Sequence, residues 1–391
     1  MLPAAVRDRP PADLPVPDQE SLAHSRRLAA HIRGEIRAAG GWIPFWRYME
    51  LALYAPGLGY YVAGARKLGP GGDFVTAPEL SPLFGHALAR QVAQILERTG
   101  GEILELGAGS GKLAADLLEG LASLERLPAR YRILEVSPEL RERQRSLLAK
   151  RLTGLLPRVE WLATLPASVS GVVLGNEVLD AVPVHLVAWR EQGVFERGVA
   201  LDGERFVWVE RPPGADLEAV AEAMAIAPPY VSEIGLTARA LTFTLARRLE
   251  RGVMLFIDYG FGRAEFYHPQ RGAGTLMCHY RHRSHDDPFL FPGLQDITAH
   301  VDFTSIAHAG QRAGLDLLGY ATQAQFLLNC GITQLLAATP AEHAAYLPAS
   351  AAVQKLVSPA EMGELFKAIA LGRGIDSPLI GFATGDRSGR L

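Results

Sequence analysis

The sequence predicts an α/β fold with a Rossmann-like core, an N-terminal helical segment and an inserted α+β lobe. From residue 101 onward, short apolar runs alternate with helical patterns, which is typical of βαβ units in a parallel sheet. A glycine-rich loop separates the first of these runs from the helical pattern that follows it. Residues 183–212 instead alternate apolar and polar side chains around Asp202 and Gly203, which indicates antiparallel hairpins.

These patterns divide the chain into parts. We expect a flexible, proline-rich leader at 1–20, and a helical segment at 21–100 with a mobile glycine-rich lid loop at 57–72. The core with its helical insertions occupies 101–182 and 251–391, and 183–250 forms an inserted substrate-binding lobe. The expected core strands are Glu102–Leu106, Tyr131–Val136, Val159–Ala163, Val172–Gly175, Val253–Asp258 and a last strand at Leu379–Ala383.

Composition excludes several classes of protein. Apolar residues make up 48% of the 391 positions, and 39 Lys and Arg against 42 Asp and Glu give a formal charge of -3. This balance supplies no field for binding nucleic acid, and no apolar run is long enough to span a membrane. Cys278 and Cys330 are too few for a disulfide framework, and the acidic leader is unlike a transit peptide. We therefore expect a cytoplasmic protein.

The expected cofactor loop follows the first core strand and consists of Glu105, Leu106, Gly107, Ala108, Gly109, Ser110 and Gly111. Glycines there let bare backbone and a helix N-terminus approach a ligand closely. The dinucleotide fingerprint requires its third glycine where Lys112 stands, which disfavours a nicotinamide-dependent oxidoreductase. The alternative is a tight turn with no ligand.

A carboxylate follows the second core strand. An adenosyl cofactor that carries an amino acid needs an acceptor for its ribose hydroxyls, and Glu135 is placed to supply one. The alternative for Glu135 is an ordinary solvated carboxylate at a strand end.

The fourth core strand ends in a polar segment, residues 176–183. Ligands of open α/β sheets bind beyond the carboxyl ends of the strands, so Glu177 and Asp180 are candidate catalytic residues. A pair of acids suits a guanidinium acceptor and can take up its departing proton, while Asn176 would brace the methionyl end of the cofactor. The alternative is a turn capped by Asn176 and Asp180.

At these residues the chain resembles the MidA family, which includes the mitochondrial complex I assembly methyltransferase. The resemblance runs from about residue 40 to 385, and it rests on the glycine loop and on residues 49–54, 72–81, 176–183 and 296–303. It implies a class I methyltransferase core that binds S-adenosylmethionine. For the mitochondrial member it also implies an arginine substrate on a respiratory complex subunit. The acidic, proline-rich leader lacks the Arg-rich character of the mitochondrial members, which favours a bacterial cytoplasmic relative.

The resemblance also places residues 72–81 near the cofactor. Thr76 and Glu79 thereby become candidate cofactor-binding residues, although Thr76 is equally suited to a local turn. His300 and Asp302 resemble an acid/base pair, but Asp302 directly precedes a helical pattern and is also a natural N-cap. We expect Asp302 to cap the following helix and keep His300 as a candidate catalytic residue.

A run of metal-type side chains follows residue 277 and consists of Cys278, His279, His282 and His285. Zinc ligands must converge tetrahedrally, and the cationic Arg281 and Arg283 within the run oppose a metal ion. A basic loop near the substrate groove is the preferred interpretation, and no metal is expected.

Taken together, the residues and the resemblance predict an enzyme that methylates a protein, with arginine as the acceptor. Glu177 and Asp180 would position that acceptor, and alignment of sulfur, methyl and nitrogen would drive the transfer. The alternative is a cofactor-binding assembly factor that holds a partner protein through the 183–250 lobe without turnover.

Overall fold

The computed structural model describes residues 14–63 and 76–391, which form two compact units. Of the described residues, unit 1 comprises 14–63, Ala181–Ala238 and Ala264–His300. Unit 2 comprises 76–180, Arg239–Arg263 and Val301–Leu391. Most of the expected leader and most of the expected lid loop lie outside the described residues. The proposal that 183–250 forms a substrate-binding lobe stays a prediction.

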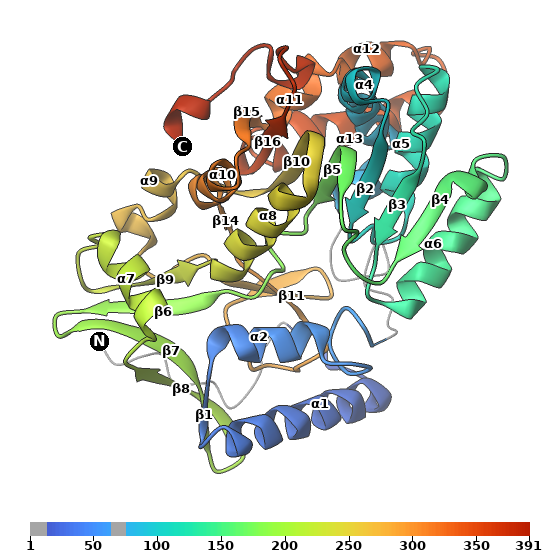
Figure 1. The fold of residues 1–391 in the computed structure, drawn as a ribbon. Coiled ribbons are helices and arrows are strands. Elements are labelled where there is room, and N and C mark those ends of the chain that lie inside the picture. Colours follow the sequence, from blue (N-terminus) through green and yellow to red (C-terminus); the bar gives the residue numbers. More distant parts are fainter. Residues whose placement is uncertain (1–13, 64–75) are drawn as a thin grey trace. The chain divides into compact units, whose positions relative to one another are not determined.

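Unit 2 is built on a sheet that has, within the described ranges, eight strands in the order β15-β16-β10-β5-β2-β3-β4, with β14 beside β10 (Figure 1). The strands are β2 (Glu102–Leu106), β3 (Tyr131–Leu134), β4 (Val159–Leu162), β5 (Val169–Asn176), β10 (Leu249–Phe261), β14 (Val301–Asp302), β15 (Asp316–Thr322) and β16 (Phe366–Arg373). Strands β4, β3, β2, β5 and β10 run parallel, whereas β16 is antiparallel to both of its neighbours. The predicted parallel core is confirmed.

The predicted last strand at Leu379–Ala383 is wrong. Residues Ile380–Phe382 form a single 3-10 turn, and β15 and β16 complete the sheet instead. The apolar residues of this segment are buried by packing rather than by pairing, because the Phe382 ring lies 5.4 Å from the Phe326 ring of α11. A short apolar run is compatible with either outcome.

Helices cover both faces of this sheet, as alternate residues of β10 show. Val253 and Leu255 belong to the large core that includes α4 and α5, while Met254 and Phe256 between them are buried on the opposite side. The helices of unit 2 are α3 (Ala77–Leu80), α4 (Pro82–Thr99), α5 (Lys112–Ser123), α6 (Pro138–Arg151), α10 (Phe303–Arg312), α11 (Gln323–Asn329), α12 (Ile332–Ala337), α13 (Tyr346–Val357) and α14 (Met362–Leu365). Helices α8 (Leu236–Arg248) and α9 (Arg263–Phe266) cross the unit boundaries.

Unit 1 confirms the antiparallel hairpins predicted after residue 183. Its described residues form the sheet β1-β7-β6-β9, with β8 on β7, and the smaller sheet β12-β11-β13. These strands are β1 (Trp42–Pro44), β6 (His185–Arg190), β7 (Gly193–Asp202), β8 (Arg205–Arg211), β9 (Tyr230–Ile234), β11 (Met277–Tyr280), β12 (Arg283–His285) and β13 (Asp296–Thr298). Helices α1 (Gln19–Ala38) and α2 (Phe45–Tyr54) share one apolar cluster with this unit, and α7 (Ala215–Ala223) packs in another.

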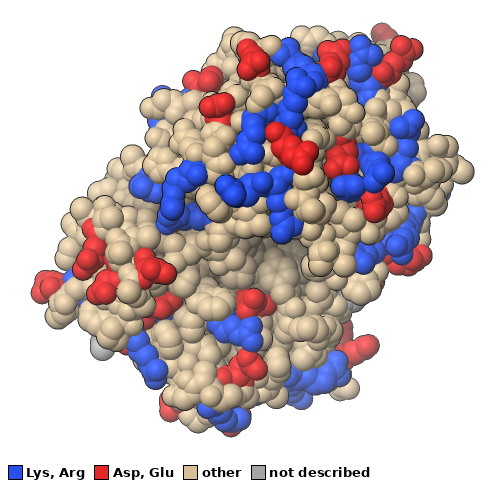
Figure 2. Space-filling view, in the orientation of Figure 1, with Lys and Arg blue, Asp and Glu red and all other residues tan. Residues whose placement is uncertain are grey.

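Charges of both signs occur side by side on the face shown in Figure 2, as the near-balanced composition predicts. None of the helices in residues 14–63 and 76–391 has the length and apolar character needed to cross a membrane.

Candidate active site

Three neighbouring strands of unit 2, β3, β2 and β5, end at the same edge of the sheet, beside β10, which continues to Phe261. Leu106 at the end of β2 pairs with Leu134 of β3 and with Gly175 of β5, and Ile257 of β10 pairs with Asn176. The strand order also reverses at β2, which is where open α/β sheets bind their ligands. The residues that follow β3, β2 and β5 therefore form one row with Asp258, the residue of β10 after its last pair with β5, in the order Glu135, Gly107, Glu177 and Asp258.

The loop after β2 has a backbone that glycine adopts readily. Gly107, Gly109 and Gly111 have φ values of 59°, 55° and 85°, in the left-handed region. A Cβ atom added to Gly111 would lie 3.2 Å from the Cα atom of Gln144, so the loop is also closely packed on its protein side. Ala108 is buried, and Gly111 is the N-cap of α5, whose first N–H groups suit a polar ligand.

Glu135 is a buried carboxyl held by specific donors. Its Oε1 accepts the Ser137 backbone N–H at 2.9 Å, and its Oε2 accepts the Gln144 side-chain amide at 3.0 Å. The same Gln144 nitrogen donates to the Gly109 carbonyl at 3.0 Å, which ties Glu135 to the glycine loop. Burial raises the pKa of Glu135, and these donors oppose that effect. Beside it, the apolar Val136 is 60% exposed.

Gln144 and Val136 are features that the sequence did not reveal. Gln144 lies on α6, where glutamine is an ordinary helix residue, and it is fully buried in the structure. The exposed Val136 follows the acidic strand end directly, and this position beside Glu135 is the signal that marks it.

Glu105 points into the protein from β2. Its Oε2 accepts a hydrogen bond from the Tyr131 hydroxyl at 2.8 Å, and the side chain is 2% exposed. Burial raises the pKa of Glu105 to about 7, with a smaller contribution from the nearby Glu135 charge. Its cofactor-binding role stays a prediction.

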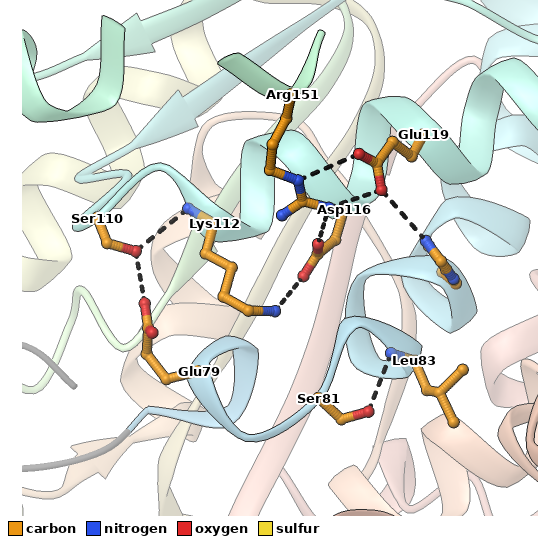
Figure 3. Close-up of polar contacts among 9 residues, drawn as sticks. Glu79, Ser81, Leu83, Ser110, Lys112, Asp116, Glu119 and Arg151 are labelled. Carbon is orange, nitrogen blue, oxygen red and sulfur yellow. Dashed lines mark hydrogen bonds and ion pairs between the residues drawn. The ribbon is translucent and has the colours of Figure 1, made fainter. Parts of the chain in front are cut away.

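Short helix α3 connects the glycine loop with the turn after β5. The Ser110 hydroxyl donates to Glu79 Oε1 at 2.5 Å, and Figure 3 shows the two side chains pointing toward one another. The backbone N–H of Ala77 donates to Glu177 Oε1 at 3.2 Å. Thr76 is the N-cap of α3 by position, without a side-chain capping bond. Both candidates from this segment, Thr76 and Glu79, therefore lie on or next to an element that contacts the site.

Lys112 has a partner inside the fold. Its Nζ lies 2.6 Å from Oδ2 of the fully buried Asp116, and Arg151 of α6 lies 2.7 Å from the other oxygen. Figure 3 shows both cations directed at Asp116, with Arg151 also paired to Glu119. This network joins α5 to α6 and fixes the start of the helix that follows the glycine loop.

The turn after β5 gathers the candidate catalytic carboxylates. Glu177 has a φ of 52°, its N–H donates to the Ile257 carbonyl at 2.9 Å, and its Oε1 accepts the Asn176 amide at 3.1 Å. Asp180 is 6% exposed and accepts the Tyr259 hydroxyl on Oδ2 at 2.5 Å. The structure thus places Asn176, Glu177 and Asp180 in the row of strand ends with the glycine loop.

His300 and Asp302 fall in different units. His300 ends unit 1, and its backbone N–H donates to the Thr275 hydroxyl at 3.1 Å. Asp302 belongs to unit 2 and caps α10, because its Oδ1 accepts the Ser305 N–H at 3.2 Å. The predicted cap is confirmed, and a catalytic role for His300 stays a prediction.

The run of metal-type residues forms a hairpin. Cys278 of β11 is buried in an apolar cluster of unit 1 and pairs with His285 of β12. In the part of the chain that the structure describes, no three His, Cys, Asp or Glu side chains are grouped as a metal ion would require.

Replacing Glu105 with glutamine tests the charge of this buried carboxyl. Because its pKa is raised from 4.5 to about 7 on folding, the folded protein holds the proton more tightly than the unfolded chain. Stability from this group is complete below pH 4.5 and is lost as the pH rises through about 7. Between about pH 5 and about pH 8, urea unfolding should therefore show Glu105→Gln gaining up to about 3 kcal/mol relative to the unmodified protein. A stability difference independent of pH would contradict this, and Glu361→Gln at an exposed site is the control.

Comparisons with known proteins agree with this geometry. Residues 87–321 match the sequence pattern of a family described as "putative S-adenosyl-L-methionine-dependent methyltransferase". The mitochondrial protein arginine methyltransferase NDUFAF7 of Danio rerio is 30% identical and aligns with 89% of this chain and 87% of its own length. The Drosophila melanogaster homolog is 28% identical, over 96% and 92% of the two chains.

A solved structure is more similar still. The crystal structure of a Burkholderia thailandensis protein bound to S-adenosyl-homocysteine is 55% identical, with a TM-score of 0.94 over 97% of this chain and 100% of that chain. These findings confirm the resemblance to the MidA family and the class I methyltransferase fold. The chain belongs to this family of S-adenosyl-L-methionine-dependent methyltransferases, and its cofactor is S-adenosylmethionine.

Proposed function

We propose that this enzyme transfers the methyl group of S-adenosylmethionine to a nitrogen of an arginine side chain in a partner protein. The observation that carries the proposal is the pair Glu177 and Asp180, which follows β5 in the same row of strand ends as the glycine loop. Two carboxylates match the charge and the paired N–H donors of a guanidinium group. The names of the relatives, at 26–30% identity, support the same acceptor.

The residues of this edge fit the cofactor, which supplies an electrophilic methyl group on a positively charged sulfur. Asn176 Oδ1 is buried and has no hydrogen-bond partner among the described residues, so it is suited to accept from the methionyl ammonium. The Ser137 N–H and the Gln144 amide each bind one oxygen of Glu135, which leaves acceptor capacity for ribose hydroxyls. The exposed Val136 offers an apolar surface to the adenine.

The protein's part in the reaction is alignment and proton transfer. A direct displacement needs the acceptor nitrogen held in line with the methyl group, and a carboxylate pair fixes the plane of a guanidinium. As the new N–C bond forms, the nitrogen loses a proton, which Glu177 or Asp180 takes up. His300 remains a further catalytic candidate.

The acceptor is identified by comparing arginine methylation in strains with and without the gene. We expect one or more arginine residues of a protein, a respiratory complex subunit among the candidates, to lose methylation in the deletion strain. Mass spectrometry of purified fractions measures this, with restoration of the gene as the control. Loss of methylation only at lysine or on a small molecule would contradict the proposed acceptor.

Glu135→Gln should weaken binding of S-adenosyl-homocysteine by about 1 to 3 kcal/mol, because a charge-assisted hydrogen bond to the ribose becomes a neutral one. Calorimetry measures the dissociation constant. Glu142→Gln, at an exposed position of α6, is the matched control and should bind as the unmodified protein does. If Glu135→Gln and the control bound S-adenosyl-homocysteine with equal affinity, Glu135 would have a structural role and not a cofactor-binding one.

Glu177→Gln and Asp180→Asn should keep affinity for the cofactor within about threefold and lose about a hundredfold or more in methylation rate, because transition-state alignment is lost while cofactor binding survives. The rate is measured as labelled methyl incorporated into a lysate of the deletion strain. Asp376→Asn, at an exposed site of unit 2, is the control. Full activity in both variants would remove their catalytic role. The assembly-factor alternative would be favoured by two results together. The inactive variants would bind the partner protein as tightly as the unmodified protein does, and the unmodified protein would transfer no methyl group.

A further inference from the structure

The end of β10 contributes two side chains to the acidic turn that the proposed function does not yet use. We propose that Asp258 and Tyr259 are positioning residues that hold Glu177 and Asp180 in place for a cationic acceptor. This inference rests on the proposed function. It concerns residues that act through the carboxylates rather than on the acceptor itself.

Asp258 fixes the backbone of the turn. Its Oδ2 accepts three successive backbone N–H groups, from Val178 at 3.0 Å, Leu179 at 2.8 Å and Asp180 at 3.3 Å. Its Oδ1 accepts the N–H of Tyr259 at 2.9 Å. Because several backbone N–H groups bind the same carboxylate, the backbone between Glu177 and Asp180 is held in one conformation.

A second contact holds the start of the turn against β10. The Glu177 N–H donates to the Ile257 carbonyl at 2.9 Å, one residue before Asp258. Glu177 is also held at a φ of 52°, a conformation that non-glycine residues adopt only when their surroundings impose it. Strand β10 therefore controls the conformation of the turn at both of its ends.

A third carboxyl group, Asp258, beside Glu177 and Asp180 costs free energy of folding. Asp258 is 1% exposed, and burial together with the charges of Asp180 and Glu177 raises its pKa well above the usual range. A neutral side chain that accepts the same N–H groups would hold the turn without this repulsion. A cation bound at the turn relieves it, which favours an acceptor that carries positive charge.

Tyr259 fixes the carboxyl group of Asp180. Its hydroxyl donates to Asp180 Oδ2 at 2.5 Å, and its ring packs edge-on against Phe366 with centroids 5.3 Å apart. Because ring packing holds the tyrosine without help from the hydroxyl, Tyr259→Phe removes the hydrogen bond and leaves the ring in place. The hydroxyl stabilises the ionised form of Asp180, the form that accepts a proton.

Two acids and one lysine of unit 2 lie close to this carboxyl or to its support. Glu177 and Asp258 contribute negative charge, and Lys367 of β16 pairs in register with Asp258. The Lys367 ammonium donates to the backbone carbonyl of Leu365 at 3.2 Å. A change in pH dependence on removing the Tyr259 hydroxyl is therefore assigned to Asp180 and its acidic neighbours.

The test compares full-length unmodified protein with Tyr259→Phe and with Tyr320→Phe, a tyrosine of the edge strand β15. The rate is methyl incorporated from labelled S-adenosylmethionine into a lysate of the deletion strain, followed from about pH 6 to about pH 9. We expect Tyr259→Phe to lose about tenfold in rate at neutral pH and to shift the acidic limb of the profile upward by about one pH unit. Binding of S-adenosyl-homocysteine should stay within about twofold, and Tyr320→Phe should match the unmodified protein.

An unchanged pH profile in Tyr259→Phe would overturn the inference, whatever its rate. A parallel loss of cofactor affinity would also overturn it, because the residue would then serve the cofactor. Asp258→Asn should lose rate in the same way while it binds S-adenosyl-homocysteine; full activity would again contradict the inference. Failure of the unmodified protein to methylate any acceptor while it binds the cofactor would instead contradict the proposed function.

Discussion

The parallel register of β3, β2, β5 and β10 is the constraint on which the rest of the structure depends. It brings the ends of β3, β2 and β5 together beside β10, and the residues proposed to contact the cofactor or the acceptor in unit 2 lie in these strands, in the loops that follow them or on and next to α3. Close approach at the opposite ends requires glycine, because a Cβ atom at Gly252 would lie 1.9 Å from the Gly171 carbonyl oxygen. A slip of one residue would turn Glu177 and Asp258 away from their partners.

The site that results concentrates acidic groups in a buried place. Glu105, Glu135 and Asp258 are each at most 5% exposed, and each accepts hydrogen bonds from protein donors. Burial of so many carboxyl groups costs free energy of folding, which is offset where a bound cation compensates the charge. The sulfonium of the cofactor and a guanidinium acceptor are both cations, so the electrostatics and the proposed reaction agree.

Much of the fold could be predicted because the sequence patterns that indicate its elements involve residues close together in the chain. The apolar runs of the parallel strands, the glycine loop and the Asp302 cap each lie within a short stretch of sequence. The error at Leu379–Ala383 arose because an apolar run does not reveal whether it pairs or packs. The position of Glu177 and Asp180 after β5, at the same edge as the glycine loop, was likewise predictable from the order of the strands.

The supporting contacts could not be predicted, since they join distant parts of the chain. Tyr259 reaches Asp180 across 79 residues, and Gln144 reaches the Gly109 carbonyl across 35. Neither tyrosine nor glutamine carries a sequence pattern that marks such a contact. Three-dimensional structure was needed to separate these residues from ordinary members of a strand and a helix.

The central claim is that one row of strand ends holds both the cofactor and a cationic acceptor. A crystal structure of the protein with S-adenosyl-homocysteine and an arginine peptide tests it most directly. The account predicts ribose hydroxyls within hydrogen-bond distance of Glu135 and a guanidinium contacting Glu177 and Asp180. Cofactor bound away from the glycine loop, or a peptide whose arginine avoids both carboxylates, would contradict it.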